Sequence, residues 1–235
     1  MIGQDFPKIS IELAGLKLLE PNAMIGDIIL FSTALFFSAK IKALANEHPF
    51  YQNWRLFYKW FGWSFLFGGF GHLFYNYLGL WGKYPSWIFG MVGTFYVTKG
   101  MASLWSNESQ RNYFLMGAKL LLALGILIEI AVFLFVDLTL DQSKGLFVPT
   151  LVSGIGLIFS LVVLGRYYQK YIGQSFSSFW IAALILLPNA IIQSQKINLH
   201  QWFDRNDFSH LLLIVSLFVY YRGIKKADLS PLFKN

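Results

Sequence analysis

The feature that most constrains this chain is a series of seven apolar stretches, each about 20 residues long, divided by short polar breaks. They cover residues 22–44, 56–80, 85–105, 112–136, 146–168, 175–195 and 207–224. A helix needs about 20 mostly apolar residues to cross the hydrocarbon core of a bilayer. The sequence therefore predicts an all-α, polytopic membrane protein, a bundle of seven transmembrane helices, in the cytoplasmic membrane if the source is bacterial. Pro188 lies inside the sixth stretch and predicts a kink there.

The composition agrees with burial in lipid. Hydrophobic residues make up 56% of the chain and charged residues only 13%, about half the usual charged fraction of a soluble domain. No hydrophilic stretch is long enough to fold as a second domain. Because the chain has no cysteine, disulfides, catalytic thiols and thiolate metal sites are excluded.

The basic residues are distributed unevenly between the two sets of helix ends. Thirteen belong to one set: Lys40, Lys42, Arg55, Lys59, Lys99, Arg111, Lys119, Arg166, Lys170, Arg222, Lys225, Lys226 and Lys234. Six belong to the other: Lys8, Lys17, Lys83, Lys144, Lys196 and Arg205. Loops rich in Lys and Arg remain in the cytoplasm, so the expected topology is N-out and C-in.

This topology divides the chain into three parts. Residues 1–21 form an extracytoplasmic segment expected at the membrane surface, residues 22–226 form the seven-helix domain, and residues 227–235 form a cytoplasmic tail. The formal net charge of +7 then reflects topology and attraction to anionic lipid. We expect the lipid bilayer as the partner of this surface, and no nucleic acid.

Polar residues from five of the expected helices fall at one depth, near the outer face: Asn22, Asp27, His72, Asn76, Glu129, Asn189, Gln193, Asn206, Asp207 and His210. Such residues are costly inside a bilayer and often mark function. Asp207 and His210 are three residues apart on one helical face, and His72 has a matching depth on another helix. Two imidazoles and a carboxylate suit zinc, with a fourth position open to water. The sequence therefore predicts a metal site of His72, Asp207 and His210.

A catalytic role for the other acidic residues follows from the zinc hypothesis. Zinc lowers the pKa of bound water to about 7, and Glu129 or Asp27 would then serve as general base or proton relay. Structural roles remain open for the same residues. Asp207 can cap the seventh helix, His72 can bond to a neighbouring helix, and Glu129 can pair with a polar neighbour. His200 lies outside the predicted helix and is expected at the interface rather than among the ligands.

Two segments carry a resemblance to a known family. His72 lies in FGGFGHLFYN, late in the second helix, and His210 lies in NDFSHLLLIVSLFVYYRG, which opens the seventh. With the seven helices and the N-out topology, they resemble the alkaline ceramidase, adiponectin receptor and post-GPI-attachment superfamily of membrane hydrolases. The resemblance implies zinc held by three histidines near one membrane face. The chain departs from that pattern at Gly68 (usually serine), at Asn206 (usually histidine) and in residues 84–105, which lack the usual aspartate.

Three functions are compatible with these features. The first is a zinc-dependent hydrolase that takes a membrane lipid as substrate and cleaves its amide or ester bond. The second is a non-enzymatic receptor or scaffold that binds a lipid headgroup or a partner. The third is a small-solute or proton transporter that uses the polar layer as a relay. The sequence leaves the oligomeric state open.

Overall fold

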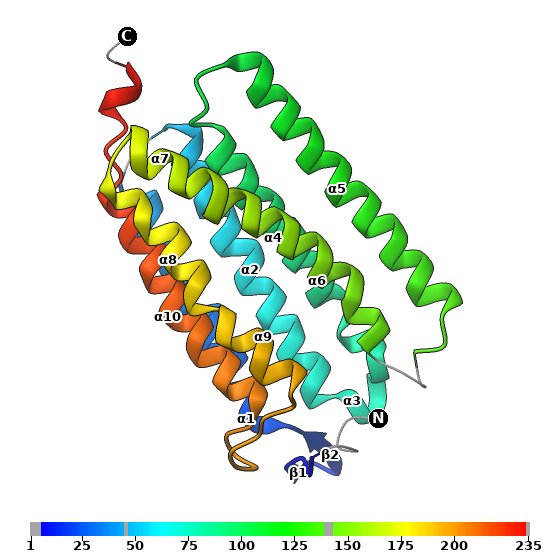
Figure 1. Ribbon diagram of the computed structural model, residues 1–235. Coiled ribbons are helices and arrows are strands. Elements are labelled where there is room, and N and C mark those ends of the chain that lie inside the picture. Colours follow the sequence, from blue (N-terminus) through cyan, green and yellow to red (C-terminus); the bar gives the residue numbers. More distant parts are fainter. Residues whose placement is uncertain (1–5, 45–46, 139–142, 234–235) are drawn as a thin grey trace.

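The computed structural model describes residues 6–44, 47–138 and 143–233, and most of them are helical (Figure 1). The longer helices are α1 (Pro21–Lys42), α2 (Pro49–Leu73), α4 (Tyr84–Ala102), α5 (Glu108–Phe135), α6 (Ser143–Leu157), α7 (Gly165–Tyr171), α8 (Ser177–Ile185), α9 (Leu187–Ser194) and α10 (Arg205–Lys226). The shorter elements are β1 (Ser10–Leu13), β2 (Leu16–Leu19), α3 (Tyr75–Leu78), η1 (Gly79–Gly82), the π-helical η2 (Ile158–Leu164), η3 (Gln174–Phe176) and η4 (Ser230–Phe233).

Within the described residues, the longer helices form seven rods, because α6, η2 and α7 run on as one rod and α8 and α9 form another. Each predicted apolar stretch lies mainly in one rod, which confirms a helical bundle. In the part of the chain that the structure describes, five segments are long and apolar enough to cross a membrane: Pro21–Lys42, Glu108–Phe135, Lys144–Tyr171, Gln174–Gln193 and Arg205–Lys226. The largest difference in boundary is at α2, which begins at Pro49 rather than at residue 56. Proline suits a first helical position, and the ring of His48 accepts a hydrogen bond from the Phe50 N–H.

Successive rods run in opposite directions, so the rods have two common ends (Figure 1). The β-hairpin, the start of α1, the end of α2 and the start of α10 meet at one of them, which we call the hairpin end. The end of α1, the start of α2 and the end of α10 lie at the opposite end. The polar residues that the sequence analysis placed near the outer face therefore lie toward the hairpin end.

The main core lies where α1, α2, α4, α8 and α10 pack together with η2 and α7. Trp54 on α2 stacks against Phe179 on α8, with 5.0 Å between ring centroids, and both are buried. Tyr58 donates a hydrogen bond of 2.7 Å from its hydroxyl to the Leu217 carbonyl of α10, so this buried hydroxyl is satisfied. Aromatic packing of this kind fixes α2 in the middle of the bundle.

Helix α5 lies at the edge of the bundle, against α4 and α6 (Figure 1). Its outward face leaves Leu120, Leu124 and Leu127 exposed. A water-soluble bundle would not leave such a continuous apolar face uncovered, whereas lipid would cover it. The side chains on this helix thus support a membrane location.

Two local features depart from continuous helix: a break near Pro188 and a β-hairpin before α1. Pro188 ends the continuous helix of its rod, because α8 stops at Ile185 and α9 restarts at Leu187. This confirms the predicted kink. The hairpin was not predicted, and it is a small exception to the all-α expectation. Ala14 and Gly15 both have positive φ, 51° and 76°, and this conformation matches a two-residue hairpin turn between β1 and β2.

Candidate functional site

A buried ionic network at the hairpin end is centred on Glu20. This residue is 1% exposed, its Oε1 lies 2.7 Å from Lys8 Nζ, and its Oε2 lies 2.6 Å from His72 Nδ1. Lys8 Nζ also lies 2.6 Å from Asp204 Oδ2. Because Lys8 precedes the hairpin, His72 ends α2 and Asp204 caps α10, the network ties three distant parts of the chain together.

The charges of this network stabilise one another. Burial would raise the pKa of the Glu20 carboxyl, but the hydrogen bond and charge of His72, together with those of Lys8, outweigh it and hold that pKa well below its usual range. Burial would lower the pKa of Lys8, yet Glu20 and Asp204 raise it above 10.5. Lys83, in the turn before α4, lies close by, and there burial lowers the pKa of the ammonium group.

Glu20 occupies a strained position in the backbone. Its φ of 49° and ψ of 52° are left-handed, an uncommon conformation for a residue with a side chain. Here the chain turns from β2 into α1, and the Glu20 N–H donates a 2.9 Å hydrogen bond to the Ile9 carbonyl. A glycine would adopt this turn more easily. We attribute the presence of a glutamate at this strained position to its ion pairs with Lys8 and His72.

A second group of contacts starts α10. The Asp204 side chain accepts hydrogen bonds from the N–H groups of Asn206 and Asp207, and Asp207 Oδ2 accepts one of 2.9 Å from the Asp204 N–H. This reciprocal arrangement is a capping box. Asp207 Oδ2 also accepts a 2.8 Å hydrogen bond from Asn22 Nδ2 on α1. The capping role that the sequence left open for Asp207 is therefore present, shared with Asp204.

One turn deeper, Asp27 on α1 pairs with His210 on α10. Asp27 Oδ1 and His210 Nε2 are 3.2 Å apart, and both side chains are buried. Within the described part of the chain, Asp27 Oδ2, His210 Nδ1 and Asn22 Oδ1 are buried polar atoms without a hydrogen-bond partner. The ring also contacts Gly26, where an added Cβ would lie 2.3 Å from His210 Nδ1. Only glycine leaves room for the imidazole at this position.

The structure brings His72, Asp207 and His210 to the same end of the bundle but not into one ligand set. His72 pairs with Glu20, Asp207 accepts from Asn22 and Asp204, and His210 pairs with Asp27. Over residues 6–44, 47–138 and 143–233, no group of three or more His, Asp or Glu side chains is arranged to hold a metal ion. The residues therefore do not fit the predicted zinc site. The three residues lie at one end of the bundle, but their side chains form separate pairs.

The remaining polar residues of the layer have local partners. His200 accepts a 3.1 Å hydrogen bond at Nδ1 from the Trp202 N–H in an exposed turn, so it lies apart from the buried pairs. Gln193 on α9 donates to Ser209 on α10 at 2.7 Å, and Ser209 donates to Asn189. These contacts join the kinked rod to α10.

Glu129, the other predicted catalytic residue, lies on a different side of the bundle from Asp27. It is 0% exposed on α5, which packs against α4 and α6, and neither carboxylate oxygen has a hydrogen-bond partner among the described residues. Asp27 is on α1 and is engaged by His210. The two predicted catalytic carboxylates are therefore not part of one site.

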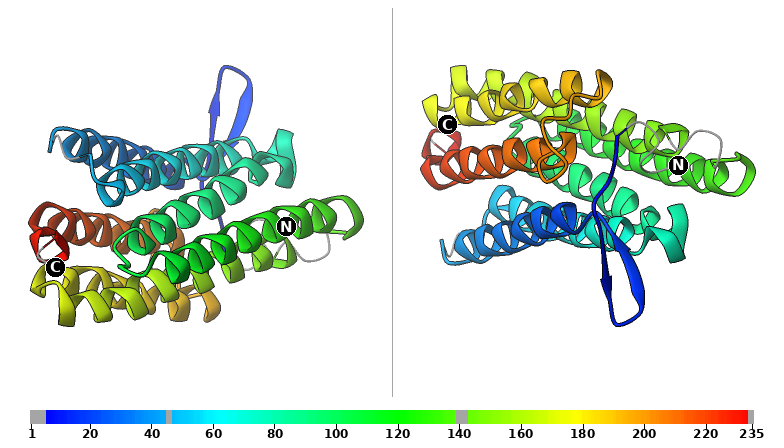
Figure 2. Two further views of the ribbon diagram at one scale, coloured as in Figure 1. Left: turned by 90° about the horizontal axis from the view of Figure 1, so that it is seen from above. Right: turned by 90° about the horizontal axis from the view of Figure 1, so that it is seen from below.

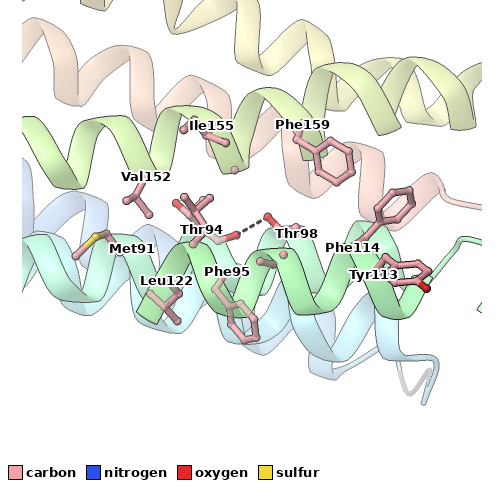
Figure 3. A pocket seen from close by; sticks show the side chains of 14 residues that line it. Met91, Thr94, Phe95, Thr98, Tyr113, Phe114, Leu122, Val152, Ile155 and Phe159 are labelled. Carbon is pink, nitrogen blue, oxygen red and sulfur yellow. Dashed lines mark hydrogen bonds between the residues drawn. The ribbon is translucent and has the colours of Figure 1, made fainter. Parts of the chain in front are cut away.

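A cleft that the sequence analysis did not predict lies between α4, α5 and the rod of α6 and η2. Its volume is about 340 Å³. Its lining is almost wholly apolar, as Figure 3 shows: Met91, Thr94, Phe95, Thr98, Tyr113, Phe114, Gly117, Ala118, Leu121, Leu122, Val152, Ile155, Gly156 and Phe159. Gly117 leaves open space, since an added Cβ would meet nothing within 4 Å, whereas Gly156 lets α6 approach Thr94 closely. These glycines on neighbouring apolar stretches were the signal that sequence reasoning missed.

The two threonine hydroxyl groups in this cleft are satisfied by the protein itself. Thr94 donates to the Gly90 carbonyl at 3.2 Å, and Thr98 donates to the Thr94 carbonyl at 3.1 Å. Ser160 on η2 donates to the Thr98 hydroxyl at 2.8 Å. Such bonds leave little unmet polarity for a ligand. The cleft therefore suits an apolar molecule.

The chain was compared with known families, curated proteins and solved structures. No curated protein and no solved structure matches it. Residues 23–229 match a protein family described as a family of unknown function, DUF6962. The matched region begins in α1 and ends after α10, so it includes all seven rods and the cleft. Because most of its length matches, this chain belongs to DUF6962.

Proposed function

We propose that the protein crosses the membrane seven times, N-out and C-in, and binds the apolar chain of a membrane lipid without hydrolysing it. The seven antiparallel rods support this topology. So does the distribution of Lys and Arg: among the described residues, twelve belong to the end opposite the hairpin and six to the hairpin end. In this topology the hairpin end lies outside the cytoplasm. The function is that of a lipid-binding receptor or scaffold.

The observation that carries the proposal is the apolar cleft beside α5. Its volume of about 340 Å³ lies within the range of known ligand cavities, about 300–1,000 Å³. Its walls are helices that we propose to span the membrane, so lipid acyl chains would surround it. Met91, Leu122 and Val152 form one end of it, and Tyr113 with Phe114 forms the other. A single flexible hydrocarbon chain fits such an elongated, dry space.

Hydrolysis has less support. A zinc hydrolase needs several metal ligands around one point, and His72 and His210 instead form separate pairs with Glu20 and Asp27. Among the described residues, the Glu129 carboxylate has no hydrogen-bond partner, and it lies on a different helix from both histidine pairs. The binding alternative requires only the cleft.

Photo-crosslinking with a fatty-acyl probe that carries a diazirine tests the proposal. Gly117 lines the cleft, and a Cβ added there meets nothing within 4 Å, so Gly117→Leu fills the space without a clash. Gly154 on α6 is equally open but lies outside the lining, so Gly154→Leu is the matched control. We expect Gly117→Leu to reduce labelling roughly tenfold, because one extra methylene in a hydrophobic pocket changes the binding free energy by about 1–3 kcal/mol. Equal labelling of the two variants would contradict the proposal.

A proton-linked transport function is a second candidate, favoured by the Asp27–His210 pair alone. A buried carboxylate and imidazole within spanning helices often form part of a proton path. Proteoliposomes that contain a pH-sensitive dye would measure proton entry after a pH jump. Asp27→Asn should abolish a protein-dependent flux, and a variant of the exposed His200, His200→Gln, should not. A wild-type flux no greater than that of empty liposomes would exclude this candidate.

A further inference from the structure

The β-hairpin has one wholly apolar face. Strand residues alternate between faces, and residues paired across an antiparallel ladder lie on the same face. Ile11 pairs with Leu18, and Leu13 pairs with Leu16. One face therefore consists of four apolar side chains. The opposite face contains the pairs Ser10–Leu19 and Glu12–Lys17, and the second of these brings opposite charges together.

Strand β2 of the hairpin is fastened to α3 through Lys17, which pairs with Glu12 in the middle of the hairpin. Lys17 donates a 2.9 Å hydrogen bond from its N–H to the Tyr77 hydroxyl, and its carbonyl accepts one of 2.9 Å from Asn76 Nδ2. Leu18, on the apolar face, is only 5% exposed. Since the member of this face nearest the bundle is buried, the apolar face is turned toward the bundle.

The tip of the hairpin projects beyond the bundle. Figure 2 shows the two strands extending sideways, across the direction of the helices. The other three members of the apolar face, Ile11, Leu13 and Leu16, are exposed, and Leu13 is 63% exposed. An isolated two-stranded hairpin with an uncovered apolar face is at best marginally stable in water. Something apolar must cover this face.

Lipid is the cover that the surroundings favour. Exposed aromatic side chains lie on other elements at the same end: Tyr77, Trp81 and Trp202. Tyr and Trp are enriched where a membrane protein meets the headgroup layer. A hairpin that runs across the helix direction at this level lies along the membrane surface. Its apolar face, turned toward the bundle, then faces the acyl chains beside it.

We propose that the hairpin is an interfacial anchor that inserts Ile11, Leu13 and Leu16 into the outer leaflet of the membrane, with Glu12 and Lys17 facing water. The two charges of the hairpin cancel, and Lys8 is engaged by Glu20 and Asp204. Insertion is therefore driven by apolar contact and does not need anionic lipid. This inference rests on the spanning topology proposed above and is independent of the cleft.

The absence of cysteine from the chain allows a clean test with single nitroxide labels in lipid nanodiscs. The labelled variants are Leu13→Cys on the apolar face, Glu12→Cys on the opposite face, and Leu127→Cys on the exposed side of α5. Accessibility to oxygen, which concentrates in lipid, is compared with accessibility to a water-soluble nickel complex. We expect labels at Leu13 and Leu127 to be more accessible to oxygen than to the nickel complex. The label at Glu12 should be more accessible to the nickel complex, and both results should hold in zwitterionic and in anionic nanodiscs.

Each other outcome overturns the anchor in a recognisable way. Nickel accessibility at 13 with oxygen accessibility at 127 would place the hairpin in water while leaving the spanning topology intact. Protection of 13 from both reagents would mean that a second copy or another protein covers the face. Water accessibility at 127 would contradict the topology itself.

Discussion

His210 on α10 holds Asp27 on α1 at 3.2 Å through its Nε2, while its Nδ1 lies against Gly26, one residue before that aspartate. Gly26 and Asp27 thus contact the two sides of one imidazole. The ring is fixed between a backbone that leaves it space and a carboxylate that orients it. This contact joins the first and last rods at the hairpin end.

Gly26→Ala is expected to destabilise the protein. The added Cβ would lie 2.3 Å from His210 Nδ1, so the ring must move and lengthen its contact with Asp27. Overpacking of this kind typically costs about 1–3 kcal/mol. The thermal unfolding midpoint in detergent should fall. Gly154→Ala, at an open helical position, should leave it unchanged or raise it slightly. Equal midpoints for the two variants would mean that α1 and α10 are not this close.

Glu20→Gln should weaken the attachment of the hairpin. A neutral amide leaves Lys8 and His72 without their shared carboxylate, and removal of one partner of a buried ion pair costs roughly 3–5 kcal/mol. Limited proteolysis between residues 8 and 20 should become faster than in the wild type. Glu12→Gln changes an exposed carboxylate of the same hairpin and serves as the control. Unaltered proteolysis of Glu20→Gln would show that the network does not hold the hairpin.

The same network predicts a loss of stability in acid. The pKa of Glu20 is lowered in the folded state from its ordinary value of 4.5, so its contribution is present above that pH and declines as the pH falls below it. The pKa of Lys8 is raised from 10.5, so its contribution is lost only as the pH rises beyond that value. Unfolding midpoints measured from about pH 6 down to about pH 3 should fall less steeply in Glu20→Gln. Parallel curves for wild type and variant would contradict this assignment.

The sequence predicted the helices well because lipid imposes a length and an apolarity on each of them. It also predicted that Asn22, Asp27, His72, Asp207 and His210 would gather at one end, since antiparallel rods alternate in direction. Depth follows from position along a helix. The rotation of each helix about its axis does not, and that rotation decides which side chains meet. The zinc hypothesis required His72 and His210 to face one point, and they face different carboxylates.

The features that the sequence analysis did not predict depend on contacts between distant residues, on local backbone conformation, or on how the helices are rotated. The partner of His72 is Glu20, which precedes the first apolar stretch, and no pattern in the sequence joins the two. The hairpin depends on positive φ at Ala14 and Gly15 rather than on strong strand propensity. The cleft depends on the relative rotation of α4, α5 and α6. Gly117 and Gly156 indicate close approach or empty space equally well until the neighbouring helices are placed.

The proposed topology predicts opposite locations for the two termini. A reporter fused after Asn235 should be active in the cytoplasm, and one fused before Met1 should be active on the other side. The reason is that an odd number of spans separates the termini and the basic ends remain in the cytoplasm. If both reporters are active on the same side, one of the seven rods does not cross the membrane, and the depth assignments fail.

Zinc content tests the hydrolase alternative separately from lipid binding. Elemental analysis of the detergent-purified protein should find no stoichiometric zinc, because His72 and His210 are each engaged by a carboxylate in a separate pair. His72→Ala and His210→Ala should not change the metal content. Stoichiometric zinc that both substitutions remove would mean that the imidazoles rearrange around a metal, and would restore the hydrolase interpretation.

The most direct test of the central claim is the lipid that remains bound after stringent delipidation in detergent, quantified by mass spectrometry against protein. The cleft between α4, α5 and α6 should retain a chain-bearing lipid in an equimolar amount in the wild type and in Gly154→Leu. Gly117→Leu, which fills the cleft, should retain little or none. Equal retention by Gly117→Leu and Gly154→Leu, or no retained lipid in the wild type, would contradict the account.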